Sequence, residues 1–265
     1  RPQDGLESSG IVANLTNFSI STASATPAAT VGSFSAASFN GNIQDKTIAS
    51  IDANTVIDNY GYIDAVSQIN YLGATGFSDV LFVENLGVLD PRFGVNWSVV
   101  DPGAGNDLVI GSVDPNRVTT RDDMAFNRVQ YNSAEDFARW QMEWVNEQLI
   151  ANGETPLPDP QGITIDLATA RFDITWDKTT SFKTAVDNSP ITATANWAGG
   201  VVDSAVLSAA EAYFDAYSNN AWNNGASTLK ATGYLITDAF GDTDLIFNIG
   251  SFGGTSFADS LTGDA

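Results

Sequence analysis

The hydrophobic positions in the second half of the chain follow a period of two, which is typical of half-buried β-strands. In the segment ARFDITWD (170–177), Phe172, Ile174 and Trp176 alternate with polar side chains. The same alternation, or a short apolar run that ends at a turn residue, predicts strands at 80–87, 162–167, 191–197, 227–237 and 243–252. Clusters of Gly, Asn, Asp and Pro separate these segments and predict turns between them.

Two segments instead carry apolar residues at helical spacing. The first covers about 133–152 and ends at Gly153, before three closely spaced prolines. The second covers about 203–218, and its buried face is expected to carry Val206, Ala210, Phe214 and Tyr217. A third, shorter helix is expected at 63–72. Many strands with two packed helices predict an α+β, β-rich fold, built as an antiparallel sandwich or a curled sheet. No internal repeat of solenoid length is evident.

By composition the chain divides into three parts. Residues 1–40 are expected to form an extended arm, because segment 19–39 is uncharged and rich in Ser, Ala and Thr. Such a segment is either a linker or a strand that pairs with the sheet edge of a neighbouring subunit. Residues 41–253 are expected to form a β-rich globular domain, and residues 254–265 the start of a repeat structure.

The composition excludes several classes of protein. A net charge of −21 repels phosphate backbones, so nucleic-acid binding is not expected. No stretch approaches the roughly 20 apolar residues of a transmembrane segment. Cysteine and histidine are both absent, which excludes disulfides, Ser-His-Asp triads and His-ligated or Cys-ligated metal sites. An enzyme of this composition would depend on carboxylates, Tyr or Lys.

The last residues have the spacing of a calcium-binding nonapeptide, Gly-Gly-x-Gly-x-Asp-x-apolar-x. In GTSFADSLT, counted from Gly254, Asp259 falls at the sixth place and Leu261 at the eighth, and Gly263 follows. Thr255 and Phe257 stand where the repeat has glycine. In such repeats the glycines allow a tight turn that directs carbonyls and the carboxylate toward one ion, while the apolar residue points into the core of a parallel β-roll.

A second match lies in the middle of the chain. In PGAGNDLVIGS (102–112), Gly103, Gly105, Asp107 and Val109 occupy the second, fourth, sixth and eighth places. No neighbouring segment repeats it in sequence. The alternative is a Gly-rich turn that leads into a strand.

These features, together with the acidic and cysteine-free composition, resemble the RTX (repeats-in-toxin) family of calcium-dependent bacterial proteins. The resemblance implies secretion from a Gram-negative cell by a one-step exporter, and a β-roll that folds when it meets external calcium. The protease branch of that family is excluded because no His-Glu-x-x-His motif exists. The lipase branch is excluded because Gly-x-Ser-x-Gly and histidine are both missing.

The segment DAFGDTD (238–244) adds a cluster of acidic side chains. Three carboxylates within seven residues can surround a hard cation, and they repel one another without it. A plain hydrophilic turn is the alternative. The predicted calcium ligands of the whole chain are Asp259, Asp238, Asp242, Asp244 and Asp107.

The leading hypothesis is a secreted, non-enzymatic protein of the cell surface or extracellular matrix, such as an adhesin, a surface-layer subunit or a filament subunit. Its folding or assembly would depend on calcium, and its partners would be further copies of itself or cell-surface polysaccharide. One alternative is a carbohydrate-binding or carbohydrate-active domain with paired carboxylates on the helix at 133–152. The candidate side chains are Glu135, Glu143 and Glu147, with Trp140 and Trp144 as stacking platforms. A further alternative is an extracellular ligand-scavenging protein.

Overall fold

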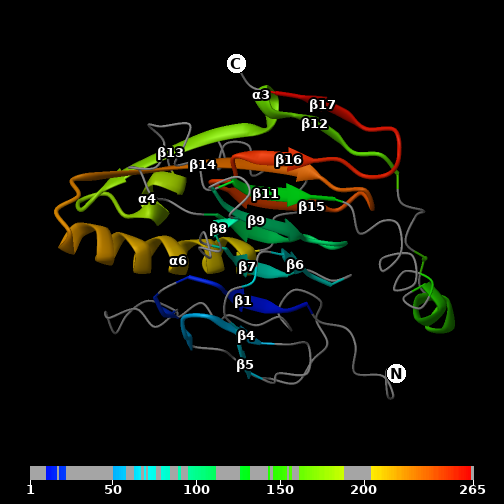
Figure 1. The fold of residues 1–265 in the computed structure, drawn as a ribbon, viewed down its shortest axis with the longest axis horizontal. Coiled ribbons are helices and arrows are strands. Elements are labelled where there is room, and N and C mark those ends of the chain that lie inside the picture. Colours follow the sequence, from blue (N-terminus) through cyan, green and yellow to red (C-terminus); the bar gives the residue numbers. More distant parts are fainter. Residues whose placement is uncertain are drawn as a thin grey trace.

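The computed structural model describes residues 10–16, 18–21, 50–57, 63–66, 69, 71–75, 79–83, 89–90, 95–111, 126–131, 143, 146–153, 155–156, 161–187 and 204–263. Within these residues strands predominate, and they form two large sheets and two small ones (Figure 1). The prediction of an α+β, β-rich fold is confirmed.

The larger sheet has eight strands and a parallel centre. Its order is β13 (Arg171–Asp177), β14 (Thr228–Thr237), β15 (Thr243–Phe247), β10 (Leu108–Ile110), β7 (Val80–Phe82), β1 (Val12–Asn14), β4 (Thr55–Ile57) and β5 (Ile63–Ala65). The adjacent strands β15, β10, β7 and β1 run parallel, whereas the strands on either side of this group pair antiparallel. The antiparallel pairing expected from the sequence therefore occurs only at the two ends of this sheet.

The second large sheet is parallel throughout its main path. Its order is β16 (Ser251–Gly253), β11 (Phe126–Gln130), β9 (Val95–Asp101) and β6 (Tyr71–Gly73), and β8 (Leu89–Asp90) pairs antiparallel with β9. The two small sheets pair β12 (Thr164–Asp166) with β17 (Ser260–Thr262), and β2 (Ile20–Ser21) with β3 (Ser50–Ile51).

The chain runs several times from a strand of one large sheet into a strand of the other, and these segments stack on one another. We call each such segment a rung. The chain crosses from β6 to β7 and again from β9 to β10, and it returns from β15 to β16. The sequence hides this repeat because its rungs are unevenly spaced: Asp79 and Asp107, which hold equivalent places, are 28 positions apart, whereas Asp107 and Asp244 are 137 apart.

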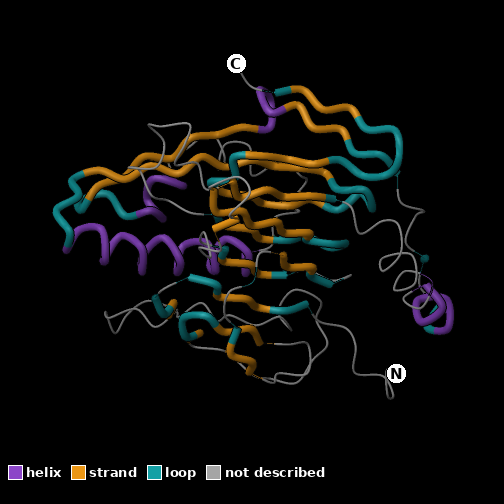
Figure 2. Tube along the Cα trace, viewed as in Figure 1, coloured by secondary structure: helices purple, strands orange, loops and turns teal. Residues whose placement is uncertain are grey.

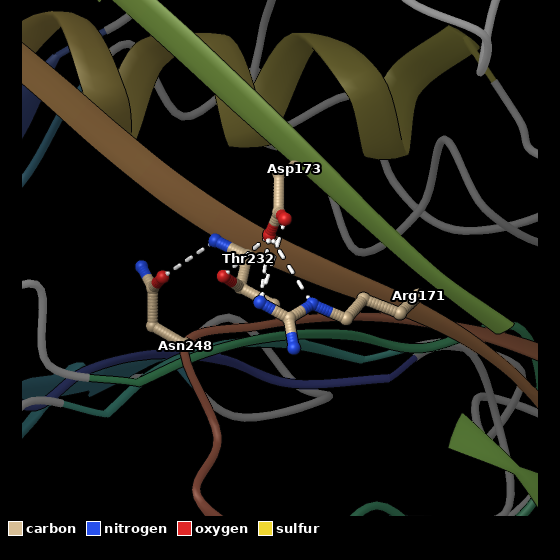
Figure 3. Close-up of polar contacts among 4 residues, drawn as sticks. All are labelled: Arg171, Asp173, Thr232 and Asn248. Carbon is tan, nitrogen blue, oxygen red and sulfur yellow. Dashed lines mark hydrogen bonds and ion pairs between the residues drawn. The ribbon is translucent and has the colours of Figure 1, made fainter. Parts of the chain in front are cut away.

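The return crossing depends on Asn248, which has a left-handed backbone with φ of 54°. Its side-chain oxygen accepts the N–H of Thr232 at 3.0 Å (Figure 3). Its own N–H donates to the carbonyl of Thr232 at 2.8 Å. On the neighbouring strand, Asp173 accepts the hydroxyl of Thr232 at 2.8 Å and lies 3.4 Å from the Arg171 guanidinium. Asn248 thus ends β15 and splits the single strand predicted at 243–252 into β15 and β16.

Apolar side chains from both large sheets form one cluster. Leu81, Val109 and Ile246 each lie two positions after a turn aspartate and are fully buried, in contact with the group that includes Val100 and Val129 of the second sheet. Each such side chain contributes about 1.5–3 kcal/mol of burial free energy. The inward apolar residue expected at the eighth place of the repeat is therefore found in the middle of the chain.

The opposite face of the larger sheet is covered by α6 (Ser204–Asn223) and α4 (Phe182–Asp187). Ala210 and Phe214 of α6 are fully buried, and the ring of Phe214 stacks on Phe182 at 4.1 Å. The indole N–H of Trp176 donates to the hydroxyl of Ser218 at 2.8 Å and anchors the helix to β13. The helix predicted at 203–218 is confirmed and extends to Asn223.

The helix predicted at about 133–152 lies only partly within the described residues, where 143 and 146–151 are helical. Figure 2 shows these residues apart from the sheets, and Ile150 is 61% exposed. The strand predicted at 191–197 lies outside the described residues. The strand at 162–167 is confirmed as β12, which the short helix α3 (Leu167–Ala170) follows after its cap at Asp166.

Two expectations for the N-terminal third differ from the structure. The helix predicted at 63–72 is wrong, because 63–65 pairs with β4 as β5 and 71–73 pairs with β9 as β6. Pairing with distant strands overrides the local helical spacing. Residues 12–14, placed by prediction in an extended arm over 1–40, form the buried strand β1 between β4 and β7. The arm boundary therefore does not coincide with the edge of the fold.

Candidate functional site

Three aspartates occupy the same place in successive rungs of the larger sheet. Asp79, Asp107 and Asp244 stand at the starts of β7, β10 and β15, and all three are fully buried. The register of the parallel strands aligns the residues that follow them, Val80, Leu108 and Leu245. We call Asp79, Asp107 and Asp244 the aspartate ladder.

Each carboxylate of the ladder accepts a main-chain N–H from the neighbouring rung. The N–H of Ile11 donates to Asp79 Oδ1, that of Asp79 donates to Asp107 Oδ1 at 2.7 Å, and that of Asp107 donates to Asp244 Oδ1 at 3.0 Å. The residue after each aspartate donates its own N–H to a carbonyl of the neighbouring rung: Val80 to Ile11 at 2.9 Å, Leu108 to Asp79 at 2.9 Å and Leu245 to Asp107 at 2.8 Å. Each rung is therefore joined to the next by one hydrogen bond from a main-chain N–H to a carboxylate and one from a main-chain N–H to a carbonyl.

The C-terminal turn repeats this geometry in a separate sheet. The N–H of Ile163 donates to Asp259 Oδ1 at 2.9 Å, and the N–H of Ser260 donates to the carbonyl of Ile163 at 2.9 Å. The N–H of Thr255 donates to Asp259 Oδ2 at 2.7 Å, as that of Thr75 does to Asp79 Oδ2 at 2.8 Å.

The sequence signal that links these two turns was missed. Residues 75–79 read TGFSD and residues 255–259 read TSFAD, so both share Thr, Phe and Asp at the same spacing. The turn at 102–107 is a third member, with Gly103 in place of the threonine. No segment adjacent in sequence repeats 102–112, as expected, but in space Asp107 lies between Asp79 and Asp244, which hold equivalent places.

The ladder brings several carboxyl groups together away from water. Burial raises the pKa of Asp79 to about 7. Burial also raises the pKa of Asp244 to about 8, against the opposing effect of hydrogen bonds from Tyr131 and Asp107. Asp238, in the turn before β15, has its pKa raised to about 9 by burial and by the carboxylates of Asp244 and Asp242. The pKa of Asp107 is also well above its usual value, through burial first and then the charges of Asp244 and Asp79.

Hydrogen bonds satisfy most of the carboxylate oxygens in this cluster. The hydroxyl of Tyr131 donates to Asp244 Oδ2 at 2.7 Å, and burial beside Asp244 raises the pKa of that tyrosine. Asp238 Oδ1 accepts the N–H groups of Phe240 and Asp242, both at 2.8 Å. Among the described residues, no donor reaches Asp107 Oδ2 or Asp238 Oδ2.

The structure thus places the predicted calcium ligands in two groups. Asp107, Asp238 and Asp244 lie in one buried cluster, and Asp242 joins it through the N–H of Gly105, which donates to its Oδ2 at 3.0 Å. Asp259 lies in the C-terminal turn. Among the described residues, no group of three or more acidic side chains is arranged to hold a metal ion. The calcium role of these aspartates stays a prediction.

Of the candidate residues for carbohydrate chemistry, the structure describes only Glu143 and Glu147. Glu143 and Glu147 are exposed on the described helical turn. Glu135, Trp140 and Trp144 lie outside the described residues.

Comparison with known protein families, with curated proteins and with solved structures found no match. Among the described residues, no helix has both the length and the apolar character needed to cross a membrane.

Proposed function

We propose that this chain is a secreted, non-enzymatic protein of the cell surface or extracellular matrix, such as an adhesin, a surface-layer subunit or a filament subunit. The single observation that carries this proposal is the repeated aspartate turn. Its carboxylates at Asp79, Asp107, Asp244 and Asp259 accept main-chain N–H groups of neighbouring strands, so they act as structural connectors between rungs. Carboxylates that serve as connectors suit a protein whose role is mechanical or adhesive.

Calcium dependence of folding or assembly is the second part of the proposal. The oxygens that remain for a cation are Asp107 Oδ2 and Asp238 Oδ2, because both are buried without a donor among the described residues. Bound there, a calcium ion would supply positive charge to carboxylates that otherwise repel one another. Asp244 Oδ2 would keep its bond from Tyr131.

The calcium part is tested on the purified protein in EGTA, in Ca²⁺ and in Mg²⁺. Thermal unfolding followed by far-UV circular dichroism should show a higher midpoint in Ca²⁺ than in EGTA, and sedimentation velocity should show whether assembly follows. An Asp238→Asn variant should lose most of the calcium response, whereas Asp64→Asn, at an exposed position of β5, should keep it. Identical unfolding and sedimentation in EGTA and in Ca²⁺ would contradict this part.

The location is tested separately in the cells that make the protein. Antibodies raised against the purified chain should label intact cells, or the surrounding medium, without permeabilisation. Labelling confined to permeabilised cells would contradict the surface assignment and would leave the calcium result unaffected.

A further inference from the structure

The outer edge of β17 continues the pattern that joins the inner rungs. The N–H of Asp79 donates to the carboxylate of Asp107 in the next rung, and the carbonyl of Asp79 accepts the N–H of Leu108. The N–H and carbonyl of Asp107 bond in the same way to Asp244 and Leu245. Asp259 already uses its carboxylate on the side of Ile163. Among the described residues, its own N–H and carbonyl have no hydrogen-bond partner, so they hold the place that the next rung fills elsewhere.

The surroundings of Asp259 are accessible. All three residues of β17 are exposed, Leu261 is 50% exposed and Phe257 is 40% exposed. In Figure 1, β17 lies at the outer limit of the fold beside β12, which is its pairing partner among the described strands. An accessible strand edge with unpaired main-chain groups is a template for a further strand.

We propose that the β17 edge binds a parallel β-strand preceded by an aspartate, through direct hydrogen bonds and without a metal ion. The aspartate of the incoming strand accepts the N–H of Asp259, and the following residue donates its N–H to the carbonyl of Asp259. The four rung junctions inside the protein support this chemistry, because each pairs a carboxylate with an N–H directly. The inference holds independently of secretion and of calcium.

The four aspartates that join rungs in a folded second copy are not free to supply this bond. Asp79, Asp107 and Asp244 are buried in the folded chain, and the carboxylate of Asp259 is bonded to Thr255 and Ile163. The partner is therefore a segment whose aspartate is still free to accept a bond.

The probe is a synthetic peptide of nine residues, TSFADSLTG, added to the full chain in EGTA. Hydrogen exchange followed by mass spectrometry should show slower exchange over 259–262 with rising peptide concentration. A peptide with alanine in place of the aspartate should bind about tenfold or more weakly, because it loses a charge-assisted hydrogen bond.

A matched variant separates edge binding from folding. The N–H groups of a strand alternate in direction, so the N–H of Leu261 faces the free edge, whereas that of Ser260 faces β12. Leu261→Pro should therefore keep the thermal midpoint of the parent chain and lose peptide protection. Ser260→Pro removes the bond to Ile163 and should lower the midpoint.

Four results would overturn the inference: no protection of 259–262, equal protection by the alanine peptide, protection that survives Leu261→Pro, or faster exchange because the peptide displaces β17. Protection that occurs only in Ca²⁺ would also overturn it, while supporting the calcium part of the proposed function. If exchange over 259–262 slows as the protein concentration rises without peptide, and sedimentation shows dimers, a second copy of the chain binds the edge and the inference is overturned.

Discussion

Replacing Gly103 by alanine tests whether successive turns pack backbone against backbone. Gly103 and Gly241 lie in equivalent turns, before β10 and β15, and both have left-handed backbones with φ of 88° and 91°. A Cβ atom at Gly103 would lie 1.9 Å from the carbonyl oxygen of Thr75, whereas one at Gly241 would meet nothing within 4 Å. The two substitutions therefore share the backbone cost and differ in the contact.

The magnitudes follow from these two terms. A left-handed conformation costs an alanine about 1–2 kcal/mol. The overlap at Gly103 involves main-chain atoms, which cannot rotate away, and adds about 1–3 kcal/mol or more. We expect Gly241→Ala to lower the free energy of unfolding by about 1–2 kcal/mol and Gly103→Ala by about 2–5 kcal/mol. The N–H of Ala104 also donates to the carbonyl of Thr75 at 3.3 Å, so the shift breaks a bond between rungs.

Urea unfolding followed by tryptophan fluorescence measures both variants against the parent chain. The midpoint should fall further for Gly103→Ala than for Gly241→Ala, with the slope of the transition unchanged. Equal losses for the two variants would show that the turns do not touch as described, and the stacked arrangement of β6–β7 on β9–β10 would then be refuted.

Three further predictions concern the ladder, the core and the surface. Burial raises the pKa of Asp79 from 3.8 to about 7, that of Asp244 to about 8 and that of Asp238 to about 9, so the folded chain binds more protons than the unfolded one across this range. In EGTA, the contribution of these groups to the free energy of unfolding should be fully present below about pH 4 and should fall as the pH rises toward 9, by about 1.4 kcal/mol per pH unit for each proton held. A free energy of unfolding that rises or stays constant over this pH range, measured by urea unfolding, would contradict this. Ile246→Ala should cost about 2–5 kcal/mol, whereas Leu261→Ala, at the same place of an exposed rung, should cost under about 1 kcal/mol in the same assay. Arg171→Gln should change the thermal midpoint very little, because its ion pair is exposed and such pairs contribute about 0–1 kcal/mol.

Local pattern was sufficient to predict the regular parts of the fold. The alternation of Phe172, Ile174 and Trp176 places the last two side chains in the core, as expected for a strand with one buried face. The spacing of Ala210 and Phe214 likewise identified the helix that covers the larger sheet. In each of these elements the buried side chains recur at a regular spacing within one continuous segment, so the local sequence is enough to predict it.

A strand was predicted at 80–87, where β7 lies, but the parallel pairing at the centre of the sheet could not be predicted in the same way. Its strands β1, β7 and β10 have three residues each, too short for a period to be visible. Their burial on both faces makes them short apolar runs without alternation. The expected ligand residues Asp107, Asp238 and Asp244 do come together, but sequence spacing could not show that backbone N–H groups from distant strands would occupy their oxygens.

The hydrogen bond between Asp107 and Asp244 also bears on how the molecule is made. It joins residues 137 positions apart, so the middle of the sheet stays incomplete until Asp244 has left the ribosome. Contacts of such long range slow folding, because the entropy of closing the intervening loop is lost before the contact contributes any stability. At translation rates of about 5–20 residues per second, the nascent chain passes several seconds with the edge of β10 open. Refolding from denaturant should accordingly be slow and sensitive to protein concentration.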